Sequence, residues 1–337
     1  MTTATLFGAF PGEIPSDVIA NLGTALMAVE DELRVQMRSA IPEVEGVGSL
    51  TLEAGGKRLR PALAVLASNA CKGTASVDRL AKLGACLEMI HMATLVHDDV
   101  IDEAATRRGK PTASSVYGNT VAILSGDVLL AKAMQILADD GDLRIIRTVS
   151  SAVVELAEGE VRELAARGHF DLSLEEHLAI LRMKTAAFIE CCCRVGAMAA
   201  DASAPQIDAL GQYGHHVGMA FQVADDLLDF RGDKAKTGKP RATDFREGQA
   251  TLPLIYLLQQ LSDSESEYAR GKFGNGVTDE DIVRIAEWMD DRGTFQQANG
   301  FAEEQASAAK SALSALPPSP ERDLLDKVAD FVVKREA

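Results

Sequence analysis

The stretch LVHDDVID at residues 95–102 places three carboxylates inside an otherwise apolar run. Asp98 and Asp102 are four residues apart, so on a helix they lie on one face, one turn apart. Neighbouring carboxylates repel one another and stay ionised together only where a cation neutralises them. Hard oxygen ligands favour magnesium, which shares its coordination shell between carboxylates, water and phosphate oxygens. The stretch therefore predicts a helix that presents a magnesium site, and the alternative is a solvated acidic helix end.

A second acidic cluster repeats this spacing much later in the chain. Asp225, Asp226 and Asp229 again follow an apolar helical run, which contains Gln222. Two helices that each present an aspartate pair to one cavity would hold several magnesium ions around a diphosphate and assist its departure. The repetition favours this interpretation over two unrelated acidic surfaces.

Basic residues cluster at three places beside the acidic motifs, at 55–61, 107–112 and 234–241. Arginine and lysine bind phosphate oxygens through charge-assisted hydrogen bonds. Glycines in these segments let the backbone approach a phosphate closely. Each cluster by itself could also consist of salt-bridge partners on a helical surface. Together with both aspartate motifs, the three clusters predict a diphosphate site.

Composition limits the classes of protein that this chain could be. Its 337 residues are 47% hydrophobic, which is enough for a large buried core, and the formal net charge is −16. A strongly acidic surface repels polyanions, so we expect no nucleic-acid partner. The five cysteines lack the spacing of a zinc site or a disulfide framework and are expected to be buried apolar residues.

The N-terminus predicts neither secretion nor membrane insertion. Arg34 is the first basic residue, so the charged region of a secretory signal is missing, and 1–15 is expected to be a loose tail. The most apolar long stretch, 186–200, is interrupted by Glu190 and Arg194 and is too short to span a bilayer. We therefore expect a cytoplasmic protein without a membrane span.

Helical signals recur along the whole chain and predict an all-α protein. Between Pro61 and Pro240 the only prolines are Pro111 and Pro205, and the intervening sequence is rich in good helix formers. We expect one domain over 1–337 that ends in a C-terminal helical section at 263–337. The polar stretch at 262–278 is expected to be a surface loop or a soft boundary before the C-terminal helices. The expected helices are 16–40, 59–71, 76–103, 116–138, 142–168, 173–200, 204–231, 251–262, 277–291, 294–315 and 319–335.

Taken together, these motifs resemble the polyprenyl (trans-isoprenyl) diphosphate synthase family. The resemblance runs in the family's order through 55–61, 88–91, 98–102, 107–112, 184–185, 222–229 and 239–253. It implies an isoprenoid synthase fold of about ten helices around a central cavity, in a homodimer. It also implies a transferase that condenses isopentenyl diphosphate with an allylic diphosphate and releases pyrophosphate. A class I terpene cyclase shares the first motif but usually has an Asn/Ser/Glu motif in second place.

The resemblance also implies a role for each matching residue. Three Mg²⁺ ions are expected with substrate bound, held by Asp98, Asp102 and Asp225, with Asp99, Asp226 and Asp229 as supporting residues. Lys57, Arg60, His91 and Arg108 match the isopentenyl diphosphate site, and Arg107, Lys184 and Lys239 match contacts to the allylic diphosphate. Thr185 and Gln222 match positions beside the developing carbocation, so that Lys184, Thr185 and Gln222 form the expected catalytic group.

The sequence departs from the family pattern at two positions. Gln249 stands where the family commonly has lysine, and Glu163 stands where many long-chain members have glutamine. The first departure leaves open a non-catalytic partner subunit as a second interpretation. Ala93 and Thr94, just before the first motif, replace the aromatic floor of short-chain synthases. They predict a geranylgeranyl or longer product, which would be delivered to membranes.

Overall fold

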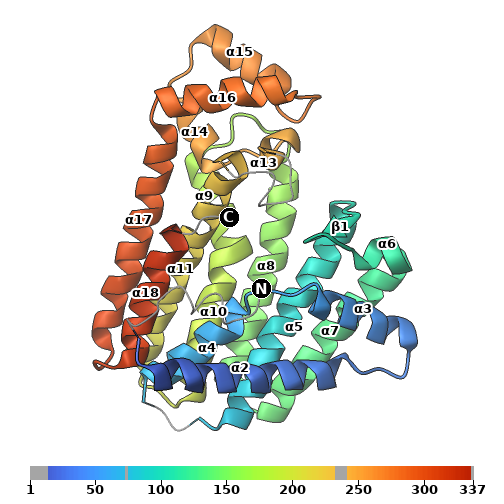
Figure 1. The fold of residues 1–337 in the computed structure, drawn as a ribbon, viewed down its shortest axis with the longest axis vertical. Coiled ribbons are helices and arrows are strands. Elements are labelled where there is room, and N and C mark those ends of the chain that lie inside the picture. Colours follow the sequence, from blue (N-terminus) through green and yellow to red (C-terminus); the bar gives the residue numbers. More distant parts are fainter. Residues whose placement is uncertain (1–13, 73–74, 232–240, 335–337) are drawn as a thin grey trace. The chain divides into compact units, whose positions relative to one another are not determined.

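The computed structural model describes residues 14–72, 75–231 and 241–334, and helices make up most of these segments (Figure 1). A short antiparallel ribbon pairs β1 (Thr106–Arg107) with β2 (Lys110–Pro111). The prediction of an all-α protein with almost no sheet is therefore confirmed. Its physical basis is the scarcity of proline and the abundance of alanine and leucine, which favour long helices.

The chain divides into two compact units that alternate along the sequence, and each unit has a core of its own. Unit 1 contains Met1–Ser150, Cys191–Gly211 and Ala315–Leu325, and unit 2 contains Ser151–Glu190, Gln212–Ser314 and Asp326–Ala337. Four helices contribute residues to both units: α8 (Leu143–Ala166), α10 (Ala187–Ala199), α11 (Ala204–Arg231) and α18 (Pro320–Lys334). The single domain over 1–337 stays a prediction.

Helix α5 (Val77–Ile101) is the central element of unit 1. It begins at the N-cap Ser76, whose side chain accepts the Arg79 amide, and it is buried along most of its length. Gly126 lies against the ring of His97, where any side chain would collide. The helices that pack on α5 are α2 (Ser16–Met37), α4 (Leu59–Ala70) and α7 (Asn119–Asp140).

The C-terminal end of α5 is surrounded by short elements of the same unit. Helices α3 (Pro42–Glu53) and α6 (Ala113–Tyr117) pack beside α7 and share a small core with α5. Thr112 is the N-cap of α6 and accepts the Ser115 amide, while its hydroxyl donates to the carbonyl of Ala104. These contacts tie the ribbon to the helix end that bears the first aspartate motif.

Unit 2 is built around an aromatic core. Phe230, Phe245 and Phe273 stack edge to face with centroid separations of 5.3 to 6.4 Å, a favourable geometry for aromatic pairs. The helices around this core include α9 (Leu174–Leu181), α13 (Thr243–Arg246), α14 (Leu252–Leu258), α15 (Asp263–Lys272), α16 (Asp279–Asp291) and α17 (Thr294–Ala312), which ends in the 3₁₀ turn η2 (Leu313–Ala315).

A π-helical turn, η1 (Arg182–Ala186), separates α9 from α10. Gly159 of α8 faces this turn, and a Cβ atom there would lie 2.8 Å from the Cβ atom of Met183. Gly218 of α11 faces it too, and a Cβ atom there would lie 2.5 Å from the Cα atom of Ala186. Both distances are below real van der Waals contact, so glycine is required for α8 and α11 to approach the turn.

Several predicted boundaries were accurate and others were wrong. The helix starts expected at Ser173 and Thr278 both exist, and Thr278 forms a complete capping box with Asp281. The surface-loop interpretation of 262–278 was wrong, because much of this stretch forms α15 behind a capping box of Ser262 and Glu265. Helix α3 was not expected, and the helix expected at 173–200 contains the π-helical turn.

Candidate active site

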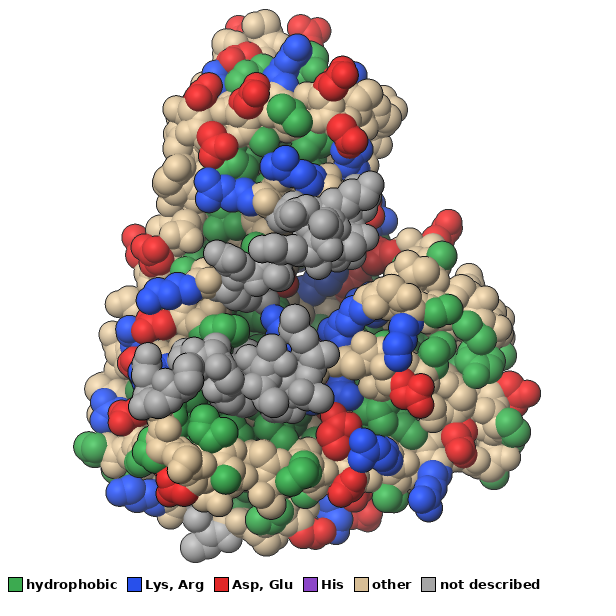
Figure 2. All heavy atoms as spheres, viewed as in Figure 1, with side chains coloured by type: hydrophobic (Ala, Val, Ile, Leu, Met, Phe, Trp, Pro, Cys, Tyr) green, Lys and Arg blue, Asp and Glu red, His purple; other side chains and the backbone are tan. Residues whose placement is uncertain are grey.

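The surface shown in Figure 2 mixes basic and acidic side chains without an extended patch of either sign. The net charge of −16 is thus not concentrated on that face. Bound diphosphate would therefore need specific local clusters of cations. One such cluster lies in unit 1 beside the first aspartate motif.

The first motif is at the C-terminal end of α5, and its three carboxylates have three different environments. Asp98 is half-buried, Asp102 is exposed at the C-cap, and Asp99 is buried with 5% exposure. Asp99 Oδ1 accepts a hydrogen bond from Arg107 Nε at 2.7 Å. The ribbon therefore brings Arg107 back onto the motif, and the central aspartate serves as an arginine partner.

A buried ionic triad in unit 1 fixes the loop before α4. Arg58 Nε lies 2.5 Å from Glu30 Oε1, and its Nη1 lies 2.9 Å from Glu88 Oε1. Arg58 adopts a left-handed conformation with φ of 47°, which is uncommon for a side chain of this size. The sequence did not predict this role for Arg58. Its signal was its place between Lys57 and Arg60, but the partners were too distant in sequence to be predicted.

His91 lies in a strongly positive part of unit 1. Loss of contact with water, and then the charges of Arg60, Arg108 and Arg107, hold the pKa of His91 well below its ordinary value. The ring is therefore neutral at physiological pH. Arg108 is exposed and donates to the carbonyl of Gly55, and Lys57 is exposed. Most of the residues expected to bind isopentenyl diphosphate are thus together in one cationic cluster.

The second motif lies near the C-terminal end of α11. Asp225 is half-buried, whereas Asp226 is buried with 3% exposure. Asp229 caps the short helix α13: its Oδ1 accepts the Thr243 amide at 3.0 Å and its Oδ2 accepts the Asp244 amide at 3.1 Å. The third carboxylate therefore holds the backbone that follows the motif.

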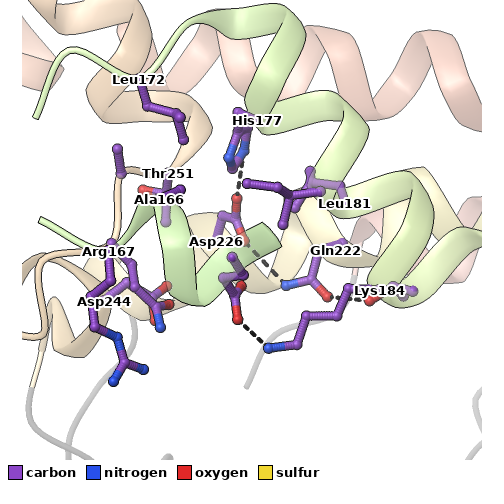
Figure 3. A pocket seen from close by; sticks show the side chains of 15 residues that line it. Ala166, Arg167, Leu172, His177, Leu181, Lys184, Gln222, Asp226, Asp244 and Thr251 are labelled. Carbon is purple, nitrogen blue, oxygen red and sulfur yellow. Dashed lines mark hydrogen bonds and ion pairs between the residues drawn. The ribbon is translucent and has the colours of Figure 1, made fainter. Parts of the chain in front are cut away.

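A cavity of about 200 Å³ lies within unit 2, next to Asp226 (Figure 3). The Thr185 hydroxyl donates to Gln222 Oε1 at 2.9 Å, and Gln222 Nε2 donates to Asp226 Oδ1 at 3.3 Å. The residues expected to surround the carbocation are thus joined to the second motif. The lining also includes Glu163, Arg167, His177, Lys184, Asp244, Gln249 and Thr251.

Lys184 is held between two carboxylates of α8. Its Nζ lies 2.8 Å from Glu160 Oε2 and also contacts Glu163. Although burial opposes it, these two carboxylates raise the pKa of Lys184 above its ordinary value. For the carboxyl group of Glu163, burial acts in the other direction and raises the pKa, although the positive charge of Lys184 opposes this shift. The sequence did not predict a role for Glu160. Its position three residues before Glu163, on the same face of one helix, was the signal that could have indicated one.

Lys239 lies outside the described residues, and the described residues contain no group of three or more His, Cys, Asp or Glu side chains that could hold a metal ion unaided. The donor set nevertheless fits magnesium. Asp98 and Asp102 offer hard oxygens one helical turn apart, and Asp225 offers another in unit 2. Magnesium is commonly bound by one or two carboxylates together with substrate phosphates rather than by a complete protein cage.

Comparison with known proteins decides the family. A model of the polyprenyl synthetase family matches residues 42–288. The chain belongs to the polyprenyl synthetase family. It is therefore a transferase.

Similar members of the polyprenyl synthetase family cover nearly the whole chain. Heptaprenyl diphosphate synthase component 2 of Geobacillus stearothermophilus is 34% identical and covers 94% of this chain and 97% of its own. A crystal structure of a Rhodobacter capsulatus decaprenyl diphosphate synthase matches with a TM-score of 0.89 at 36% identity, over 96% and 100% of the two chains. A Caulobacter crescentus polyprenyl synthase, complexed with calcium and isoprenyl diphosphate, matches with a TM-score of 0.88 at 33% identity, over 96% and 99%.

Proposed function

We propose that this polyprenyl synthetase condenses isopentenyl diphosphate with an allylic diphosphate to give a longer prenyl diphosphate and pyrophosphate. The observation that carries the proposal is the pair of aspartate motifs, each at the end of a long helix with its central carboxylate buried and partnered. Family membership supports the same reaction. The calcium in the Caulobacter crescentus complex supports a divalent-metal site.

Asp98 and Asp102 would hold magnesium in unit 1, and Asp225 would hold it in unit 2. When bound, the metal would neutralise the diphosphate charge as that group leaves. The arginine cluster around His91 binds and orients the second diphosphate through charge-assisted hydrogen bonds. Because the pKa of His91 is lowered, its ring donates a hydrogen bond without adding charge. Thr185 and Gln222 orient their oxygens toward the allylic carbon, where positive charge develops. Exclusion of water protects that charge from hydrolysis.

Lys184 is the cation of unit 2 that would contact the leaving diphosphate. In this chain it is already neutralised by Glu160 and Glu163. A diphosphate must therefore compete with two carboxylates for the Lys184 ammonium group, and Gln249 in the same cavity adds no charge. We infer that this enzyme depends more on metal ions, and less on lysine, than family members with lysine at position 249.

The product is proposed to be geranylgeranyl diphosphate or longer, and more specifically a long-chain polyprenyl diphosphate. The names of the similar heptaprenyl and decaprenyl synthases support a long product. Ala93 is fully buried between Cys86 and His97 on the same helix face, and both of these residues contact α7. We therefore propose that the small size of Ala93 serves close helix packing. Thr94 is half-buried one position on and is the better candidate to contact a growing chain.

A homodimer is supported by the apolar surface of α7. This helix has a mean hydropathy of 1.6 over 18 residues, which by length and composition alone would allow it to cross a membrane, although core helices share this property. Ile123 is 41% exposed and Leu124 is 58% exposed on the isolated chain. A second copy that covers this surface would account for it in the cytoplasmic protein that we propose. Light scattering on the purified protein measures the mass directly.

The reaction is tested by incubating the purified chain alone with Mg²⁺, isopentenyl diphosphate and dimethylallyl, geranyl or farnesyl diphosphate in turn. Mass spectrometry of the dephosphorylated products should show prenyl alcohols longer than the primer, of 20 carbons or more by the definition of the geranylgeranyl class. Hydrocarbon products would instead identify a terpene cyclase. Complete inactivity of the chain alone, restored by a second protein component, would identify a partner subunit.

A matched pair of variants tests the origin of product length. Thr94→Phe should shorten the product while leaving the fold intact, because its side chain is not fully enclosed. Ala93→Phe should destabilise the protein by roughly 1–3 kcal/mol through overpacking against α7. A shortened product from a stable Ala93→Phe enzyme, with Thr94→Phe unchanged, would assign the two positions the other way round.

A further inference from the structure

His177 is a buried side chain that none of the sequence motifs includes. It lies on α9, is 4% exposed and lines the cavity of unit 2 together with Asp226, Gln222 and Thr185. A histidine on an otherwise apolar helix face is commonly a packing residue. Here, however, the ring is aimed at a buried carboxylate (Figure 3).

His177 and Asp226 satisfy each other's remaining polar atoms. His177 Nε2 lies 3.4 Å from Asp226 Oδ2, and neither atom has a hydrogen-bond partner among the described residues. A buried polar atom without a partner costs about 1–3 kcal/mol. A small rotation of either side chain would shorten this contact to hydrogen-bond length and remove both penalties. The two side chains are thus complementary, and each is the natural partner of the other.

The other carboxylate oxygen of Asp226, Oδ1, connects the residue to Gln222 and Thr185, two members of the expected catalytic group. Gln222 Nε2 donates a hydrogen bond to Asp226 Oδ1, and Gln222 Oε1 accepts a hydrogen bond from the Thr185 hydroxyl. The reversed amide would place oxygen against carboxylate, so Asp226 determines how Gln222 is oriented. Thr185, which lines the cavity, is thereby fixed as a donor to Gln222, and its oxygen lone pairs stay available to accept.

We propose that His177 is a positioning residue that holds Asp226 and, through it, sets the orientation of Gln222 and Thr185. The inference rests on the proposed prenyl transfer, because only there do the oxygens of Gln222 and Thr185 face a developing positive charge. In this role His177 acts through Asp226 on the geometry of the groups that would contact the substrate, as outer residues commonly do for the groups that bind a metal or a substrate.

His177→Phe keeps a ring in the cavity wall but removes the donor to Asp226. The expected result is a fall in kcat of roughly tenfold to a hundredfold, the range typical for loss of an orienting partner. The Michaelis constant for isopentenyl diphosphate should change less than about twofold, because the expected contacts of that substrate belong to unit 1 and a positioning defect acts on the transition state. A merely structural role for His177 would lower thermal stability without this division between kcat and the Michaelis constant.

Two amide variants of His177 distinguish the loss of a hydrogen-bond donor to Asp226 from a change in side-chain packing. His177→Gln places an amide nitrogen at about the reach of the ring Nε2 atom and should restore kcat to within about threefold of wild type, whereas His177→Asn is too short to do so. This pair keeps the test decisive if His177→Phe fails to fold. Equal activities for the two amide variants would overturn the proposal.

His216 provides a matched control. It lies on α11, is half-buried, and its Nδ1 atom forms a 2.8 Å hydrogen bond with Gln305 Oε1, but it does not line the cavity. His216→Phe should lower the melting temperature with kcat unchanged.

A double-mutant cycle tests whether His177 acts through Gln222. His177→Phe combined with Gln222→Leu should be no slower than Gln222→Leu alone, because both changes disrupt one connected group. Rates that multiply would show that His177 acts elsewhere and would contradict the proposal.

A readout without turnover separates this inference from the proposed function. In ¹⁵N-histidine spectra, His177 should carry its proton on Nε2, and that signal should shift in Asp226→Asn. An unshifted signal would overturn the inference even in an active enzyme. If the wild-type chain forms no longer prenyl diphosphate, the proposed function fails, while the spectra still report the His177 to Asp226 contact.

Discussion

The two aspartate motifs have the same spacing, but unit 1 and unit 2 use it differently. In unit 1 the central carboxylate, Asp99, is bound by an arginine, and cationic side chains surround nearby His91. In unit 2 the central carboxylate, Asp226, is bound by an amide and faces a histidine. The first motif therefore lies in a positively charged environment suited to holding an anion. The second lies in a polar environment suited to fixing the orientation of neighbouring groups.

Asp98 and Asp225, the first carboxylates of the two motifs, are expected to be equally important for turnover, although the surroundings of the two motifs differ. Asp98→Ala and Asp225→Ala should each lower kcat/KM by about a hundredfold to a thousandfold, since removal of one electrostatic contact to developing charge costs about 2.7–4 kcal/mol. Steady-state assays at several Mg²⁺ concentrations measure this loss. Asp31→Ala, at an exposed position on α2, is the control with unchanged activity. Wild-type turnover by either variant at high Mg²⁺ would remove that residue from the metal site.

The third carboxylates should differ in stability. Asp229 accepts two backbone amides of α13, so Asp229→Ala should lower the free energy of unfolding by about 1 kcal/mol, as expected for a lost helix cap. Asp102 is exposed, and Asp102→Ala should change this free energy by less than about 0.5 kcal/mol. Urea denaturation of the pair measures the difference. Equal losses would show that the two motifs end in equivalent environments.

The cavity of unit 2 should respond to an added cation. Gln249→Lys should lower the Michaelis constant of the allylic diphosphate severalfold, because it adds a positive charge to the cavity in which Glu160 and Glu163 neutralise Lys184. The gain should shrink as salt is raised from 0.05 to 0.5 M, a range over which screening becomes strong. Gln259→Lys, in an exposed position after α14, is the matched control. A raised Michaelis constant in Gln249→Lys would show that this position does not face the diphosphate.

The smallest expected effect concerns the pH dependence of stability in unit 1. Because the folded pKa of His91 lies well below 6.5, the unfolded chain takes up a proton first as the pH falls. His91 therefore contributes stability that is present above pH 6.5 and is lost as the pH falls toward its folded pKa. The contribution changes by at most about 1.4 kcal/mol per pH unit.

His91→Gln should flatten the unfolding free energy between pH 6.5 and 5 relative to wild type, as measured by denaturation at each pH. His215→Gln is an informative companion, because burial also lowers the pKa of His215 in unit 2. A steeper slope in His91→Gln than in wild type would mean that the ring is charged in the folded protein.

The sequence predicted features that depend on local patterns. The caps at Ser173 and Thr278 and the helices that bear both aspartate motifs follow from signals within a few residues. Helix α15 was missed because its composition is polar, although its capping box lies in the sequence. The environment of each aspartate could not be predicted. Arg58 meets Glu30 from 28 residues away, and Lys184 meets Glu163 from 21 residues away, through packing that no local pattern specifies.

The π-helical turn at Arg182–Ala186 has a consequence for how this family can gain and lose residues. Such turns are commonly understood as an α-helix with one residue inserted, and they are frequent at functional sites. His177 and Thr185 are eight residues apart yet line the same cavity, whereas in a regular α-helix, at roughly 100° per residue, they would point about 80° apart. The wide turn therefore absorbs one extra residue and keeps both side chains on the cavity side. Relatives that lack this residue should have a regular helix here with its two halves still in register, whereas regularising the turn at unchanged length would separate His177 from Thr185.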